Sequence, residues 1–137
     1  MLINTTIFII MIIVKITICK FIGGVYLQVI SRNPENFTEE YNVILRRLFP
    51  ANEQCIDSNI PFSSSWVIVE KNKFTDPHRH DLHEVFFITE GEGILNIDGE
   101  EKIVTSGDVI YISPNKEHTI KNKKENKLIF LTIYWNK

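Results

Sequence analysis

Short apolar stretches with the residue preferences of β-strands follow one another at even intervals through the second half of the chain. Turn-forming residues separate nearly all of them, among them Asp98-Gly99, a strong signal for a two-residue hairpin, and the clusters at 91–93, 106–108 and 123–126. Strands this short and this evenly spaced are typical of an all-β sandwich or barrel. The predicted strands cover residues 66–70, 84–89, 94–97, 102–104, 109–112, 119–121 and 128–135.

A different periodicity precedes these strands. Thr38, followed by two glutamates, places an acceptor side chain at a helix cap and acids in the first turn, where the helix dipole favours them. Apolar residues then recur at helical spacing until Pro50 ends the run. The pattern predicts one short N-terminal helix, whose apolar positions are Tyr41, Ile44, Leu45, Leu48 and Phe49.

Residues 1–30 differ from the rest of the chain, because Lys15 and Lys20 are their only charged side chains. Three interpretations stay open: an apolar strand or helix packed on the domain, a marginal membrane anchor, or a non-native extension. Lys15 interrupts the segment well before the roughly 20 apolar residues that a membrane span needs. The lysines would flank such an anchor on its C-terminal side, so the positive-inside rule would leave the following domain in the cytoplasm. We predict an apolar N-terminal extension over 1–30 and one folded domain over 31–137.

The composition is that of one soluble globular domain. The 137 residues are 44% hydrophobic and 23% charged, which excludes a disordered chain and a multi-span membrane protein. A net charge of -2 offers no basic excess for phosphates, so we expect no nucleic-acid partner. Cys19 and Cys55 cannot form a disulfide framework or a Cys-x-x-Cys pair, which favours a reducing compartment or indifference to redox conditions.

All 4 histidines fall in two places: His78, His80 and His83 in one cluster, and His118 much later in the chain. Alternate side chains of an extended backbone share a face, so His78, His80 and Glu84 point to one side while His83 points away. A helix would place residues 78 and 80 about 200° apart, which is useless for joint ligation. Three neutral imidazoles, counting His118 from another strand, and one carboxylate suit a divalent Fe, Mn, Ni or Zn ion and leave coordination positions open.

Two motifs around these residues resemble those of the cupin superfamily over roughly residues 66–135. The run His78-x-His80-x3-Glu84-x6-Gly91 resembles the first motif, Gly-x5-His-x-His-x3or4-Glu-x6-Gly. In the segment 107–122, the glycine, the histidine and the final asparagine, Gly107, His118 and Asn122, are in register with the second motif, Gly-x5-Pro-x-Gly-x2-His-x3-Asn.

Three positions depart from the motifs. Asn72 and Asn115 stand where the motifs have glycine, and the proline of the second motif is displaced by one position to Pro114. Asparagine is the non-glycine residue that best tolerates the left-handed region, so we expect both turns to survive. None of these three differences from the motifs falls on a candidate metal-ligating residue.

The resemblance implies a small β-barrel of the single-domain, RmlC-like jelly-roll type, with a divalent metal ion held inside by His78, His80, Glu84 and His118. It points to a small-molecule metalloenzyme, such as a dioxygenase, isomerase or lyase. The alternative is a non-catalytic module that senses or binds a small molecule and acts with a partner.

The predicted strand 84–89 is apolar on both faces. Phe86 and Ile88 share the inward parity of Glu84 and would line the cavity, to which Tyr111 or Trp66 would add an aromatic face. The outward side chains of this strand, at positions 85 and 87, are apolar as well, so we expect the outer face to be covered. Proteins similar to this one often dimerise, and the resemblance therefore implies a homodimer.

Overall fold

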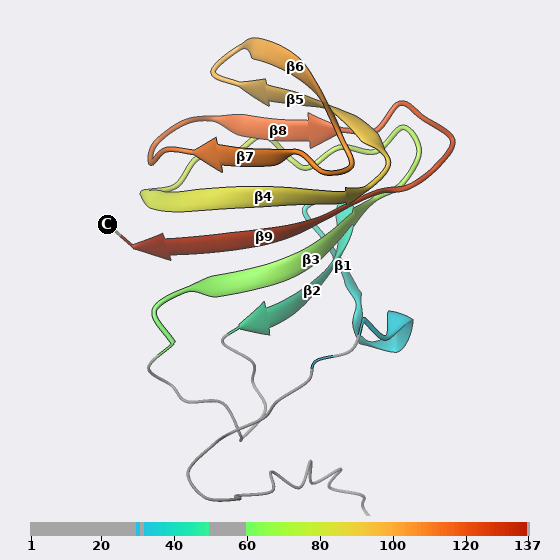
Figure 1. Ribbon diagram of the computed structural model, residues 1–137, viewed down its shortest axis with the longest axis horizontal. Coiled ribbons are helices and arrows are strands. Elements are labelled where there is room, and N and C mark those ends of the chain that lie inside the picture. The colour runs from blue at the N-terminus through green and yellow to red at the C-terminus, as the bar shows by residue number, and fades with distance from the viewer. Residues whose placement is uncertain (1–29, 31, 50–59, 137) are drawn as a thin grey trace, which may run out of the picture.

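The computed structural model describes residues 30, 32–49 and 60–136, and these residues form two antiparallel sheets (Figure 1). Every strand predicted from the sequence is present, with ends that differ by a few residues. In chain order the elements are the 3-10 turn η1 (Pro34–Asn36) and the strands β1 (Thr38–Glu40), β2 (Val43–Phe49), β3 (Ser63–Val69), β4 (Leu82–Glu90), β5 (Glu92–Ile97), β6 (Glu100–Thr105), β7 (Val109–Ile112), β8 (His118–Lys121) and β9 (Leu128–Asn136).

The two sheets form the jelly-roll β-barrel that the sequence predicted. The larger sheet has the strand order β1-β2-β3-β9-β4-β7 and the smaller one has the order β6-β5-β8. In Figure 1, β9 runs between β3 and β4, while β5, β6 and β8 lie together beyond β7. Because side chains alternate between the faces of a strand, each sheet turns one apolar set inward. The inward set is Val43, Leu45, Val67, Val69, Phe86, Ile88, Leu95, Val104, Ile112, Ile120, Leu128 and Phe130.

The predicted N-terminal helix is wrong, because residues 38–49 form the hairpin of β1 and β2. Tyr41 and Asn42 have φ angles of 52° and 62°, which are the left-handed values that a two-residue hairpin turn requires. Within β2, Val43 and Leu45 are buried on one face. Pairing of β2 with β3 satisfies the backbone and buries this face, and the tertiary gain outweighs the helical spacing of the apolar residues.

Asn122, the last residue of the second motif, is fully buried. Its side chain stabilises the connection between β8 and β9 through three hydrogen bonds. Its amide donates hydrogen bonds to the Val69 carbonyl at 3.0 Å and the Asn126 carbonyl at 2.8 Å. Its side-chain oxygen accepts a hydrogen bond of 2.8 Å from the Lys124 backbone N–H. Because buried polar groups need partners, this one side chain ties the turn to the end of β3.

The turns of the two motifs keep their left-handed backbone. Asn72 and Asn115 have φ angles of 61° and 65°, so asparagine does replace glycine there as expected. At Gly91 the requirement is stricter, because φ is +83° and an added Cβ would lie 2.4 Å from the Lys127 carbonyl oxygen. Only glycine fits this close approach of two backbones.

Among the described residues, no helix is long and apolar enough to cross a membrane. The three interpretations of residues 1–30 concern a segment that lies, except for residue 30, outside the described part of the chain. The cytoplasmic location and the domain boundary near residue 31 stay predictions.

Candidate metal centre

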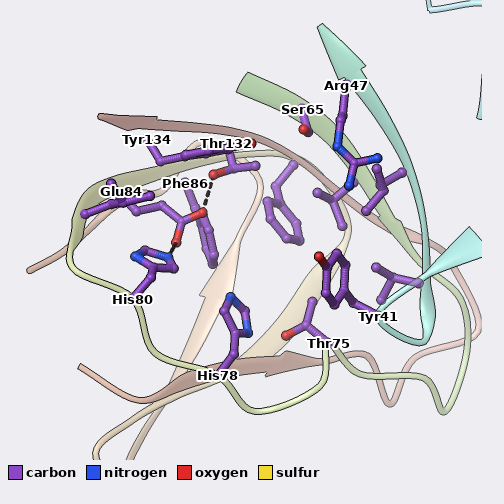
Figure 2. A pocket seen from close by; sticks show the side chains of 15 residues that line it. Tyr41, Arg47, Ser65, Thr75, His78, His80, Glu84, Phe86, Thr132 and Tyr134 are labelled. Carbon is purple, nitrogen blue, oxygen red and sulfur yellow. Dashed lines mark hydrogen bonds and ion pairs between the residues drawn. The ribbon is translucent and has the colours of Figure 1, made fainter. Parts of the chain in front are cut away.

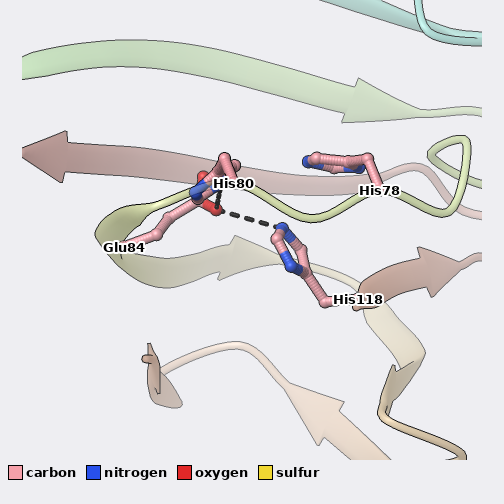
Figure 3. A group of neighbouring side chains, drawn as sticks. All are labelled: His78, His80, Glu84 and His118. Atoms are coloured by element: carbon pink, nitrogen blue, oxygen red, sulfur yellow. Dashed lines mark hydrogen bonds and ion pairs between the residues drawn. The ribbon is translucent and has the colours of Figure 1, made fainter. Parts of the chain in front are cut away.

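The structure brings together the four side chains that the sequence singled out (Figure 3). His78 and His80 lie on the extended segment before β4, Glu84 lies in β4, and His118 begins β8 in the other sheet. Reciprocal backbone hydrogen bonds of 3.2 and 2.9 Å join His78 to His118, so the segment that leads into β4 is tied to the smaller sheet at this point. One ligand atom from each of the four residues lies within 4.8 Å of the others.

Backbone carbonyls determine which nitrogen of two imidazoles faces the centre. Nδ1 of His78 lies 2.7 Å from the Asp76 carbonyl, and Nδ1 of His118 lies 2.9 Å from the Lys116 carbonyl. Since a carbonyl only accepts, each Nδ1 carries a proton, and in the neutral imidazole the Nε2 that faces the centre presents a lone pair. A carbonyl partner on the outer nitrogen is the usual support of a histidine that binds a metal ion.

Glu84 is 6% exposed and its two oxygens have different partners. Oε1 accepts a short hydrogen bond from the hydroxyl of Thr132 on β9, which is itself buried. Oε2 lies 3.0 Å from His80 Nε2 and 3.1 Å from His118 Nε2. Thr132 therefore leaves one oxygen of the carboxylate directed at the imidazoles.

Burial and hydrogen bonding set the protonation of the ligands. Burial lowers the pKa of His78, which keeps its imidazole neutral. Burial acts to raise the pKa of Glu84, but contacts with His118 and the Thr132 hydroxyl outweigh it, so the pKa lies below its usual value. Burial acts to lower the pKa of His118, but the Glu84 carboxylate and the Lys116 carbonyl raise it overall. At neutral pH Glu84 is an anion facing imidazoles.

These residues fit a divalent metal ion. Nδ1 of His80 and Nε2 of His118 are buried polar atoms without a hydrogen-bond partner among the described residues, although Nε2 is close to Glu84. Such atoms are costly unless something binds them. Three imidazole nitrogens and one carboxylate oxygen are a donor set for Fe(II), Mn(II), Ni(II) or Zn(II), and four protein ligands leave positions open on a six-coordinate ion.

A cavity of 280 Å³ opens beside the candidate ligands (Figure 2). His78, His80 and Glu84 lie at one side, and Tyr41 and Arg47 at the other. Its apolar walls come from β2, β3, β4 and β9. The volume lies just below the usual range of about 300 to 1,000 Å³ for small-molecule sites, so the ligand must be small.

The expected parity of the strand around Glu84 is confirmed. Phe86 and Ile88 both point inward and are buried, but of the two only Phe86 lines the cavity. His83 points outward, where it lies between the rings of Tyr111 and Trp135 and contacts the Tyr111 hydroxyl at 2.7 Å. The prediction that Tyr111 adds an aromatic wall to the cavity is therefore wrong, because its side chain is 55% exposed on the outer face.

Trp66 does not line the cavity either. Its neighbours in β3, Ser65 and Val67, are the residues that face inward, and the indole lies on the other face beneath the Arg32 guanidinium. A cation placed over an aromatic ring stabilises this outward position. Tyr111 and Trp66 both lie on the outer face because side chains alternate between the two faces of a strand.

The sequence reasoning missed Thr132 and the residues that β2 and the turn before it contribute. Thr132 had a readable signal, since it is a polar residue with the inward parity of Phe130 in an otherwise apolar strand. Tyr41 and Arg47 were hidden by the wrong helix prediction, and only the hairpin turns them toward the cavity.

Residues 65–134 match the sequence profile of the Cupin domain family. An uncharacterized protein of Methanocaldococcus jannaschii is 35% identical over 80 residues, which are 58% of this chain and 62% of that protein. An acireductone dioxygenase of Alcanivorax borkumensis is 31% identical over 70 residues, which are 48% of this chain and 39% of the enzyme. The chain thus spans less than two thirds of the length of these curated relatives.

Solved structures support the same architecture. The plu4264 protein of Photorhabdus luminescens superposes with a TM-score of 0.72 and is 30% identical. The similarity covers 80% of this chain and 88% of that one.

Proposed function

The chain belongs to the cupin family, and from this premise we propose that it is a divalent-metal enzyme acting on a small molecule in the cavity. His78, His80, Glu84 and His118 would hold the ion. Among the reactions open to such a centre, we propose oxygen-dependent cleavage or oxidation by a dioxygenase.

The proposal is carried by the convergence of three imidazoles and one carboxylate at the wall of a cavity. When bound, the ion would supply Lewis acidity and, as Fe(II) or Mn(II), the electrons for chemistry with O₂. The chain contributes the imidazoles of His78 and His118, which backbone carbonyls orient toward the centre. Its apolar walls exclude water from the reacting molecule.

The residues around the cavity favour a dioxygenase over an isomerase or lyase. Proton transfer between substrate atoms needs a positioned acid or base in addition to the ligands. Among the described residues that line the cavity, the carboxyl and imidazole groups are those of the candidate ligands, and the hydroxyls of Tyr41 and Tyr134 are the remaining groups that could transfer a proton. The A. borkumensis relative is named a dioxygenase, which supports the same choice over the matched segment.

The first test is elemental analysis of protein purified without added metal or a histidine tag. We expect near-stoichiometric iron, manganese, nickel or zinc in the wild type and its loss in the double variant His80→Ala, His118→Ala. The matched control is His83→Ala, which removes an imidazole from the outer face and should keep the metal. A wild type without metal, even after anaerobic reconstitution, would overturn the proposal.

The second test separates an enzyme from a binding module. Iron-loaded protein is incubated with small hydroxy, oxo and enolic acids while oxygen uptake is recorded. Uptake that disappears in the double variant and persists in His83→Ala supports the dioxygenase. Stoichiometric metal with ligand binding and no turnover would favour the sensing or binding module instead.

A further inference from the structure

The body of the cavity is largely apolar, although the hydroxyl-bearing residues Ser65, Thr75 and Tyr134 also line it. Val43 and Leu45 come from β2, Val67 from β3, Phe86 from β4 and Phe130 from β9, and all five side chains are buried. An apolar wall offers no hydrogen bonds, so a polar group pressed against it loses its hydration without compensation. The walls therefore select a ligand whose body is hydrocarbon.

Charge is confined to the two ends of the cavity. Among the described lining residues, Glu84 and Arg47 are the charged ones. The terminal nitrogens of Arg47 each lie 2.6 Å from one oxygen of Glu40, a bidentate pair at the rim. This contact with Arg47 holds the pKa of Glu40 at about 2, so the pair has no net charge at neutral pH. Figure 2 shows Arg47 across the cavity from His80 and Glu84.

The charge balance limits the ligand to one negative charge. A divalent ion with three neutral imidazoles and the Glu84 carboxylate would leave one positive charge at its end of the cavity. A monoanion would neutralise it, whereas a dianion would place its second charge against apolar walls or beside an arginine that Glu40 already neutralises. The 280 Å³ hold on the order of ten non-hydrogen atoms at roughly 30 Å³ each.

Building on the proposed metal centre, we propose that the protein binds a monoanionic chelating acid with a compact apolar body, in the class of branched 2-oxo and 2-hydroxy acids. The carboxylate and the adjacent oxygen would face the metal ligands. The hydrocarbon body would lie against Val67 and Phe130. Small dicarboxylates of the same size are discriminated against.

The test uses full-length protein loaded with Co(II) under nitrogen, whose visible absorption reports ligation without turnover. Cobalt stoichiometry is measured first. The loaded protein is then titrated with 4-methyl-2-oxopentanoate and with 2-oxoglutarate, which share the chelating end and are similar in size. We expect 4-methyl-2-oxopentanoate to bind at least about ten-fold more tightly, the scale on which apolar pockets discriminate.

A rim variant tests the origin of the preference. Glu40→Gln frees the charge of Arg47, so the affinity for 2-oxoglutarate should rise about five-fold, the equivalent of roughly 1 kcal/mol, while 4-methyl-2-oxopentanoate is unaffected. Glu39→Gln is the matched control, because it removes the same charge from the adjacent exposed position of β1. It should leave both affinities unchanged.

Each outcome of these titrations either supports or overturns the proposed ligand class. The expected preference, reduced in Glu40→Gln alone, supports the assigned class. Stoichiometric cobalt with equal or tighter binding of 2-oxoglutarate, or with neither acid bound, overturns the class and leaves the metal centre standing. Failure to bind cobalt overturns both, since the class depends on the ion.

Discussion

Thr132 offers the sharpest test of how the barrel prepares its metal ligands. The hydroxyl donates to Oε1 of Glu84 inside the barrel, and both residues are 6% exposed. Thr132→Val keeps the shape and removes the donor, which leaves a buried carboxylate oxygen unpaired. Hydrogen bonds to charged groups contribute about 1.5 to 3 kcal/mol, so the metal-free variant should lose free energy of unfolding in that range. The pKa of Glu84 should rise, because this bond lowers it.

The variant should also bind metal more weakly. Loss of a partner that orients a ligand typically costs about 10- to 100-fold in metal affinity. The assays are urea unfolding in the presence of a chelator and a competitive Co(II) titration at pH 7. Thr132→Ser is the matched control: it loses a buried methyl group, at about 0.8 kcal/mol, but keeps the hydroxyl and should bind metal like the wild type.

The two variants separate positioning from simple packing. If Thr132 only fills space, Val, which keeps the shape, should bind metal like the wild type, and Ser, which loses the methyl group, should be the more damaging change. If Val binds Co(II) within about two-fold of the wild type, the hydroxyl does not orient Glu84 and the reasoning is refuted.

Four further predictions follow from contacts elsewhere in the barrel. Asn122→Ala removes three hydrogen bonds of a buried amide and should lower the free energy of unfolding by about 2 to 4 kcal/mol in urea; a loss below about 1 kcal/mol would contradict the role given to it. Gly91→Ala drives a Cβ into a carbonyl oxygen at positive φ and should cost at least about 1 to 3 kcal/mol in thermal unfolding. The contact with Arg47 lowers the pKa of Glu40, so its stabilisation is complete above the usual value of 4.5 and is lost as pH falls toward about 2; the difference in stability between wild type and Glu40→Gln should shrink over that window. The expected homodimer would use the exposed outer face of β7, so Tyr111→Glu should give a monomer by sedimentation equilibrium, and a monomeric wild type would refute it.

The contrast between the two halves of the chain shows when sequence patterns are reliable. From residue 63 onward, turn residues and strand-like stretches have one consistent interpretation, and the strands form where they were predicted. In residues 38–49 the apolar residues fit both a helical spacing and, through Val43 and Leu45, the alternation of a strand. Val43 and Leu45 are buried because β3 offers a sheet edge to β2, a partner that local sequence does not reveal.

The sequence by itself determined the candidate ligands His78, His80, Glu84 and His118, because side-chain parity on an extended chain and the spacing of two motifs are local properties. It also determined the left-handed turns at Asn72 and Asn115, which depend on one residue each. Only the tertiary structure decided which other side chains surround those ligands. Thr132 reaches Glu84 and Arg47 reaches the cavity through pairings between strands far apart in the chain, and such contacts depend on the register of the sheet.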